Sequence, residues 1–203
     1  MTQTPPAAAD DNTAWVSVEI PAPPTDVLDF CRDLGRLLRL NPYLEIRAWQ
    51  EAPGPFGAGK HYRLHALNEM TGIERDLTLR VEATQANGFA IAYSEGTKRA
   101  LALSVAPHGT GTALTLREHY DRDADPAVLA KEVDRGLMSW AVAIRRHYIG
   151  MQRWGALPGY RRARCFWLAM RPRERRIGRL LIWISALEFV LFLVVLAFLK
   201  AEL

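Results

Sequence analysis

The sequence predicts an α+β domain, a curved antiparallel sheet packed on a long C-terminal helix, followed by one transmembrane helix. Three observations lead to this fold class. Short segments of alternating apolar and polar residues recur between turn signals as far as Tyr120, which is typical of an antiparallel sheet. A long pattern of helical periodicity then runs to about Trp154. The last third holds an almost unbroken apolar run, Leu180–Leu199, and about 20 such residues span a bilayer as a helix.

The strand predictions rest on alternation, because successive side chains of a strand point to opposite faces of the sheet. The Asn87-Gly88 pair between two alternating segments is typical of a hairpin turn. The expected strands are Ala14–Ile20, Tyr43–Glu51, Lys60–Asn68, Ile73–Thr84, Phe89–Ser94, Arg99–Ala106 and Thr112–Tyr120.

Two segments repeat apolar residues every three or four positions, as helices that bury one face do. The first is expected to form short helices: its pattern starts at Pro23-Pro24-Thr25-Asp26 and runs to Leu38, and Asn41-Pro42 ends it. The second starts at Asp125-Pro126, an N-cap residue followed by proline at the first helical position. We expect its apolar face to lie in the concave side of the sheet, with Leu129, Val133, Leu137, Trp140, Ile144, Tyr148 and Met151.

Composition divides the chain into four parts. Residues 1–13 are rich in Pro, Ala and Asp and are expected to form a disordered tail. Residues 14–157 form the α+β domain, which is long enough to bury a core. Residues 158–179 form a basic interfacial linker, and residues 180–199 form the transmembrane helix. A buried core helix is the alternative for this last segment.

Positive charge is concentrated in the linker. The chain has 26 Lys and Arg against 22 Asp and Glu, a net charge of +4. Eight arginines lie between residues 161 and 179, so the remainder is slightly acidic, which argues against a nucleic-acid partner. Because basic residues stay on the cytoplasmic side of a span, we expect a single-pass protein of the inner (cytoplasmic) membrane. Its N-terminal domain is then in the cytoplasm.

The linker mixes these arginines with aromatic residues, which is typical of segments that lie in the interface of anionic membranes. A plain linker is the alternative. Within the span, Glu188 is either tolerated by a very apolar helix or is the contact for a membrane-protein partner. The residues expected at the membrane surface are Arg161, Arg162, Arg164, Trp167, Arg175 and Arg176.

Motifs for catalysis or metal binding are scarce. Gly54–Lys60 has the GxxxxGK spacing of a P-loop, but His61 stands where a magnesium-binding Ser or Thr is required, so a hairpin loop is expected there. His61 and His65 share a strand face without the spacing of a metal site. Cys31 and Cys165 form no CxxC pair, which fits a reducing compartment. We therefore predict no metal, no cofactor and no catalytic residue set.

The opening of the domain resembles the START-like superfamily, also called SRPBCC or polyketide cyclase/Bet v 1-like. The resemblance is carried by an apolar strand, the segment Pro21–Phe30 (PAPPTDVLDF) and the later Leu40-Asn41-Pro42. It covers about Ala14–Trp154 and implies the helix-grip fold, in which a cavity between sheet and helix holds sterols, phospholipids, quinones, polyketides or other apolar ligands. A C-terminal membrane tail is similar to that of a subgroup that serves membrane-borne or lipophilic ligands.

We expect the cavity between the long helix and the apolar strand faces. Tyr62, Arg75, Tyr93, Glu118 and Tyr120 place polar groups on these faces, where they orient a ligand or find partners. We favour an ion pair between Arg75 and Glu118. The predicted ligand-binding residues are Tyr62, Leu64, Leu77, Tyr93, Leu103, Leu116, Trp140, Ile144 and Tyr148.

These features predict membrane-tethered binding or transfer of a hydrophobic small molecule, a lipid, quinone or isoprenoid. One alternative is a polyketide cyclase or aromatase that polarises carbonyls with Tyr and Arg or Glu. Another is a non-catalytic subunit of a membrane complex. The sequence places no cluster of His, Asp and Glu on one face, and this favours binding over catalysis.

Reporter fusions at Met1 and Leu203 test the predicted orientation. The N-terminal reporter is expected to read as cytoplasmic and the C-terminal reporter as lying across the membrane, because all the flanking arginines precede the span. A periplasmic signal from the N-terminal fusion would contradict this topology.

Overall fold

Seven strands form one antiparallel sheet in the computed structural model, which describes residues 12–121 and 136–201. The strand order is β1-β7-β6-β5-β4-β3-β2, so β1 and β2 are the two edges. Every expected strand is present within one or two residues of its predicted bounds. The strands are β1 (Thr13–Ile20), β2 (Leu44–Glu51), β3 (His61–Asn68), β4 (Ile73–Gln85), β5 (Gly88–Tyr93), β6 (Lys98–His108) and β7 (Gly111–Tyr120).

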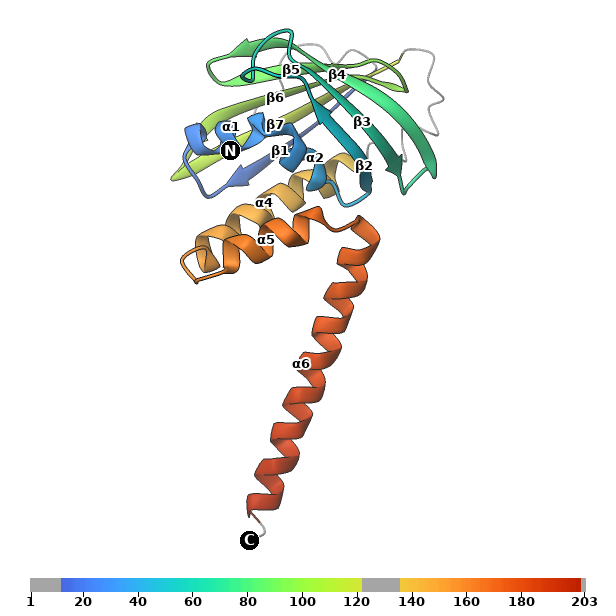
Figure 1. Ribbon diagram of the computed structural model, residues 1–203. Helices are drawn as coiled ribbons and strands as arrows, with labels where there is room; N and C mark the ends of the chain where they lie inside the picture. The colour runs from blue at the N-terminus through green and yellow to red at the C-terminus, as the bar shows by residue number, and fades with distance from the viewer. Residues whose placement is uncertain (1–11, 122–135, 202–203) are drawn as a thin grey trace.

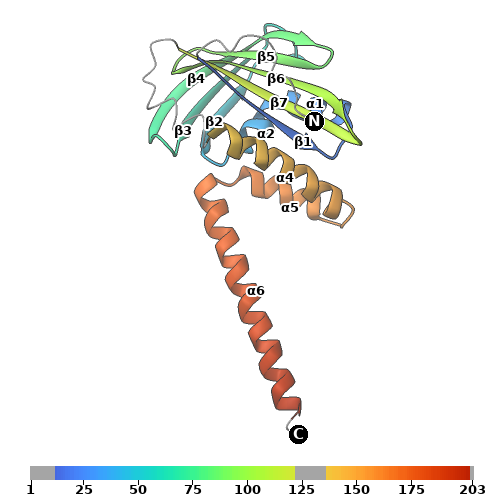
Figure 2. The same cartoon turned by 180° about the vertical axis from the view of Figure 1, so that it is seen from behind.

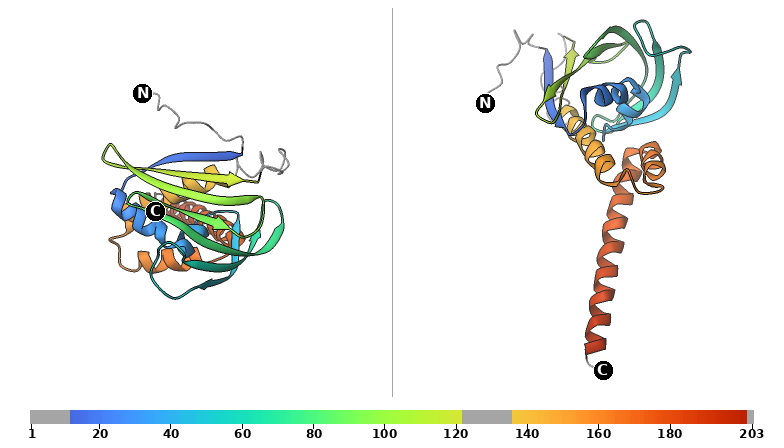
Figure 3. Two further views of the ribbon diagram at one scale, coloured as in Figure 1. Left: turned by 90° about the horizontal axis from the view of Figure 1, so that it is seen from above. Right: turned by 90° about the vertical axis from the view of Figure 1, so that its left-hand side faces the viewer.

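The sheet is strongly curved, and its concave face holds the core (Figures 1 and 2). The pairing register shifts at Arg47 in β2, at Glu82 in β4 and at Arg99 in β6. Such β-bulges bend a strand and increase its twist. The two edge strands therefore curl toward each other around the first helices, as Figure 3 shows in its right-hand view.

Two short helices form the first predicted helical segment. The helix α1 (Pro24–Arg32) ends before Asp33, and α2 (Leu34–Arg39) begins after it. Asp33 leaves the helical conformation with ψ of 80°, and its carboxylate accepts a hydrogen bond from the backbone N–H of Arg36 at 3.0 Å. Asp33 therefore caps a new helix inside the apolar pattern, and the segment forms short helices, as expected from the sequence.

The helix α4 (Met138–Trp154) packs on the concave side, as predicted for the second helical segment. The expected start at Asp125-Pro126 lies outside the described residues. Trp140 and Ile144 are fully buried. The indole N–H of Trp140 donates to the carbonyl oxygen of Leu37 at 2.9 Å, which joins α4 to α2. The predicted fold class, a curved antiparallel sheet on a long helix, is confirmed.

The predicted basic linker contains the helix α5 (Tyr160–Ala169) and the first turns of α6 (Pro172–Ala201). Leu168 of α5 is buried with the core. Pro172 begins α6, where its missing N–H costs no helical hydrogen bond. Figure 1 shows α6 leaving the domain. Among the described helices, it alone is long and apolar enough to cross a membrane, and no residue of its apolar window is buried.

The backbones of β5 and β6 approach closely at Gly88, and substitution of this glycine tests that contact. A Cβ at Gly88 would lie 2.2 Å from the carbonyl oxygen of Leu103, whereas one at Gly57 would meet nothing within 4 Å. Gly88→Ala is therefore expected to lower the free energy of unfolding by roughly 1–3 kcal/mol. Gly57→Ala, the control, should change it by less than about 0.5 kcal/mol. Thermal unfolding of both variants in lipid nanodiscs measures this, and equal melting temperatures would refute the steric argument.

Candidate functional site

A cavity of about 170 Å³ opens between one end of the sheet and the start of α4. It is bounded by the end of β3, the first half of β4, the β5–β6 turn, the end of β7 and the end of α2. Ligand pockets commonly measure roughly 300–1,000 Å³, so this cavity is smaller than a typical small-molecule site. Its apolar lining includes Leu38, Leu44, Leu64, Ala66, Leu77, Leu137 and Trp140.

The polar part of the lining is centred on Glu118, whose side chain is only 2% exposed. Its carboxylate forms an ion pair with Nζ of Lys98 and accepts a hydrogen bond from the hydroxyl of Tyr120. A buried carboxylate needs such partners, because removing an ion from water costs several kcal/mol. Two opposite charges and a phenol thus lie together inside an otherwise apolar cavity.

Tyr93 extends this polar end. Nζ of Lys98 lies 5.9 Å from the centroid of the Tyr93 ring, within range of a cation–π contact. Burial raises the pKa of Tyr93 to about 12. Its hydroxyl therefore remains protonated at neutral pH and keeps a proton to donate to a ligand.

The predicted ion pair between Arg75 and Glu118 is wrong. Glu118 is on β7 and Arg75 is on β4, two strands further than the β6 neighbour. Neighbouring strands are about 4.8 Å apart, so Lys98 of the adjacent strand reaches the carboxylate first. Arg75 lines the cavity, half-buried, and makes no hydrogen bond or ion pair with other residues in the described part of the chain.

The structure brings together some of the predicted ligand-binding residues and separates others. The four that line the cavity are Leu64, Leu77, Tyr93 and Trp140. Three more lie deeper in the concave face, in closely packed core, and these are Leu103, Leu116 and Ile144.

The last two predicted residues are tyrosines at the other side of the core. Tyr62 packs against Trp49, with ring centroids 5.3 Å apart. Tyr148 packs edge-on against Phe30, and its hydroxyl donates to the carbonyl oxygen of Asp26 at 3.2 Å. Both tyrosines therefore serve contacts between elements of the fold.

Sequence reasoning missed the cavity residues that lie outside regular strand alternation. Leu38 and Asn41 come from the end of α2, and Lys98 is the first residue of β6. One signal was present for Lys98. Glu118 falls on an apolar strand face and so requires a cation nearby, and Lys98 begins the strand that pairs with β7.

Several arginines of the predicted membrane surface contact the domain itself. Nη1 of Arg175 donates to the carbonyl oxygen of Arg39 at 2.9 Å. Arg176 donates to the carbonyl oxygen of Pro42 at 3.2 Å and forms an ion pair with Glu69. These contacts hold the start of α6 beside the α2–β2 loop and the β3–β4 hairpin, and both segments also line the cavity.

The remaining predicted surface residues differ in exposure. Arg164 is half-buried and donates from Nε to Nδ1 of His147 at 3.3 Å. Trp167 packs against Gly178, where a Cβ would lie 3.2 Å from its ring. Arg161 and Arg162 are exposed on α5.

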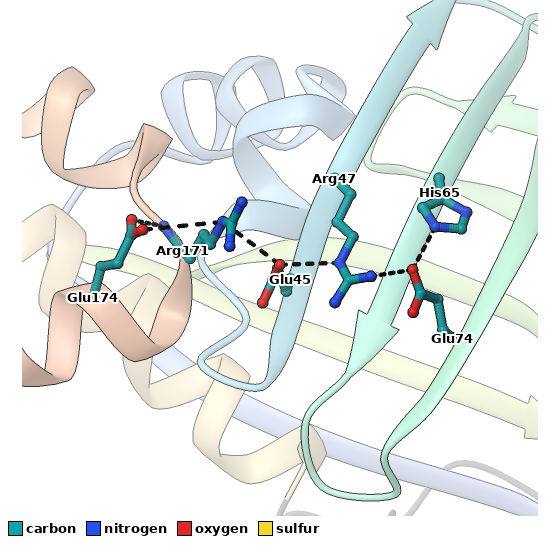
Figure 4. Close-up of polar contacts among 6 residues, drawn as sticks. All are labelled: Glu45, Arg47, His65, Glu74, Arg171 and Glu174. Carbon is teal, nitrogen blue, oxygen red and sulfur yellow. Dashed lines mark hydrogen bonds and ion pairs between the residues drawn. The ribbon is translucent and has the colours of Figure 1, made fainter.

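A chain of ion pairs connects the α5–α6 junction to the outer face of the sheet (Figure 4). Arg171 lies 3.7 Å from Glu45, which also accepts from Nε of Arg47 at 3.1 Å. Arg47, the residue at the β2 bulge, pairs in turn with Glu74. The bulge thus turns Arg47 toward the neighbouring acidic residues.

This chain ends at His65, which lies between Glu74 and Asp76 at 2.6 and 2.9 Å. The hydrogen bond to Asp76, followed by that to Glu74, raises the pKa of His65. The described residues include no group of three or more His, Cys, Asp or Glu arranged to hold a metal ion.

The P-loop-like segment Gly54–Lys60 is a loop that leads into β3, with no helix after it. Lys60 is buried, and its Nζ donates to the carbonyl oxygens of Ala52 and Gly54. It also pairs with Glu51 at 3.0 Å. The lysine therefore closes the loop on itself.

Residues 13–153 match the model of a family described as polyketide cyclase / dehydrase and lipid transport. The match covers more than half of the chain, and the chain belongs to this family. The START-like, or SRPBCC, assignment made from the sequence is confirmed. No curated protein shows significant sequence similarity to the chain.

Solved structures share the fold at low identity. NE0264 from Nitrosomonas europaea has 8% identity and a TM-score of 0.56 over 73% of this chain and 99% of its own. Ara h 8.0201 has 16% identity and a TM-score of 0.50 over 68% and 97%. Major latex-like protein 151 from Panax ginseng has 14% identity and a TM-score of 0.50 over 68% and 97%. At these identities the likeness shows the fold alone.

The burial of His147, which joins α4 to α5, predicts that the stability of the protein depends on pH. Burial, followed by the nearby Arg164 and Arg36, lowers the pKa of His147 to about 4. In the unfolded chain this histidine binds a proton near pH 6.5, whereas in the folded chain it stays neutral until the pH is much lower. The contribution of neutral His147 to the free energy of unfolding is therefore complete above pH 6.5 and falls as the pH drops toward 4.

Between pH 7 and pH 5 the expected loss is of the order of 1–2 kcal/mol for the parent protein. His147→Gln, which stays neutral, should lose less over the same range. Thermal unfolding of both proteins at each pH measures the difference. Parallel pH profiles would show that His147 titrates normally in the folded protein.

Proposed function

We propose that this member of the polyketide cyclase / dehydrase and lipid transport family binds or transfers a hydrophobic or amphipathic small molecule: a lipid, quinone or isoprenoid. The observation that carries the proposal is the cavity, which has an apolar wall and one polar end. An apolar lining with a few converging polar groups is the usual form of a small-molecule site. The description of the family, which includes lipid transport, supports the same class of ligand.

The proposal includes a membrane tether. The helix α6 is exposed along its apolar length, as a helix that lies in lipid would be. Arginines precede this length, which supports a cytoplasmic domain on an inner membrane. Arg161 and Arg162 are exposed on α5 and are available for anionic lipid head groups. Glu188 is exposed on α6 and remains the proposed contact for a membrane-protein partner.

Catalysis is a second candidate, favoured by one specific arrangement. Glu118, Lys98 and Tyr120 form a buried ion pair and hydrogen bond beside the cavity. A carboxylate, an ammonium and a phenol held together are able to move protons and polarise a carbonyl group, as a cyclase or aromatase of this family requires. Binding stays the first candidate, because the carboxylate is already occupied by its two partners.

The cavity proposal is tested by filling the space. Leu77 lines the cavity and is half-buried, whereas Leu103 is 2% exposed in packed core. Leu77→Trp should displace a bound lipid with little change in stability. Leu103→Trp should overpack the core and cost roughly 1–3 kcal/mol.

Mass spectrometry of lipids that co-purify with the full chain, alongside the melting temperature of each variant, separates these outcomes. The parent protein is expected to carry a lipid that Leu77→Trp lacks. A parent protein without any bound lipid, together with a marked loss of stability in Leu77→Trp, would mean a solid core and would reject the binding function.

A further inference from the structure

One charged side chain that lines the cavity has no ion-pair partner among the described residues. Within the described part of the chain, four charged residues line it: Arg75, Glu95, Lys98 and Glu118. Lys98 and Glu118 form an ion pair and neutralise each other. Glu95 is exposed at the β5–β6 turn, where water solvates it. Arg75 is left as a half-buried cation that contacts no acidic residue in the described chain.

The acidic residues next to Arg75 in sequence face the other way. Successive residues of a strand point to opposite faces, so Glu74 and Asp76 lie on the outer face, where both bond to His65. Arg75 instead faces the cavity from β4, opposite Ala66 of β3, which also lines it. The geometry of the strand therefore keeps the two acidic sequence neighbours of Arg75 from pairing with it.

Gly96 provides the space in which the guanidinium lies. A Cβ at this position would be 2.5 Å from Nη1 of Arg75, and the φ of +105° at Gly96 favours glycine. The guanidinium thus rests against the backbone of the β5–β6 turn at the polar end of the cavity. Tyr93, which begins this turn, adds a protonated hydroxyl to the same end.

We propose that the ligand is an amphiphile with a carboxylate head group, which Arg75 binds at the polar end while Leu64, Leu77 and Trp140 contact its hydrocarbon. This inference rests on the proposed binding function and names the ligand class. A guanidinium presents its N–H donors in a planar fork that matches the two oxygens of a carboxylate. Charge-assisted bonds of this kind are about twice as strong as neutral ones, and they strengthen where water is partly excluded.

The charge balance favours a carboxylate over a phosphate monoester. A carboxylate carries one negative charge, which the one unpaired guanidinium neutralises. A phosphate monoester carries about two at neutral pH, and its second charge would remain near Glu118 with Lys98 already engaged. An amine head group would place a second cation beside Arg75.

Four probes with the same alkyl chain and different head groups test the inference: octanoate, 1-octanol, octylammonium and octyl phosphate. Isothermal titration calorimetry uses the full chain in phosphatidylcholine nanodiscs, with empty nanodiscs as the blank. Octanoate is expected to bind roughly 10- to 100-fold more tightly than octanol, and octylammonium more weakly than octanol. Octyl phosphate should bind no more tightly than octanoate.

Variants of two arginines on β4 test whether Arg75 causes the preference for octanoate over octanol. Arg75→Gln should remove the preference for octanoate while octanol still binds, and Arg75→Lys should retain part of it. Arg80→Gln is the matched control, because Arg80 is exposed on the same strand, away from the cavity. Its octanoate affinity should equal that of the parent protein.

Equal affinities for octanoate and octanol in the parent protein, or an unchanged preference in Arg75→Gln, would overturn the carboxylate inference and leave the binding function standing. Failure of all the probes to bind would overturn the binding function, and this inference with it. An unchanged melting temperature of Arg75→Gln confirms that the comparison is made on folded protein.

Discussion

The concave face of the sheet is apolar along most of its length and must be shielded from water, and the rest of the structure depends on how that is done. At one end, α1 and α2 fill the curve, and the strand residues beneath are fully buried, as Leu79 and Val81 of β4 are. At the other end the same strand presents Arg75 and Leu77, which are only half-buried. Among the described residues, the helices cover the sheet incompletely there, and the cavity is the uncovered part.

The positions of polar residues match this division of the concave face into a packed end and an open end. The charged side chains of the concave face stand at the open end, where Glu118 has Lys98 and Tyr120 as partners. In the packed half, a charge without water or a partner would cost more than the stability that one residue contributes. A carboxylate on an apolar strand face is therefore informative in two ways. It marks the end of the sheet that is not packed solid, and it requires a cation on a neighbouring strand.

The sequence was sufficient for the strands, because alternation is a local property of each segment. It did not show where the first helical segment divides, since apolar periodicity continues through Asp33 while the side chain of that residue caps α2. The sequence also did not show that Leu77 lies in the cavity whereas Leu103 lies in the core. Both alternate correctly and face the same side, and only their distance from the open end of the sheet places one in the cavity and the other in the core. That distance depends on register and curvature, which arise from bulges that no local pattern marked.

The arginines that precede the apolar part of α6 show how one composition can serve two physical roles. Arg39 is the last residue of α2, where backbone acceptors lack helical partners, and Pro42 lies in the loop that follows. Arg175 and Arg176 donate to the carbonyl oxygens of these two residues. Glu69 and Glu45 neutralise part of the remaining charge.

Counting arginines in the sequence therefore overstates the positive charge that is available to contact a membrane. Arg161, Arg162, Arg173 and Arg179 remain exposed and form no ion pair with another described residue, so the positive excess beside the apolar helix persists after the structural contacts are subtracted. The same contacts place the start of that helix against loops that line the cavity, so the proposed membrane anchor is connected to the proposed ligand site through these loops.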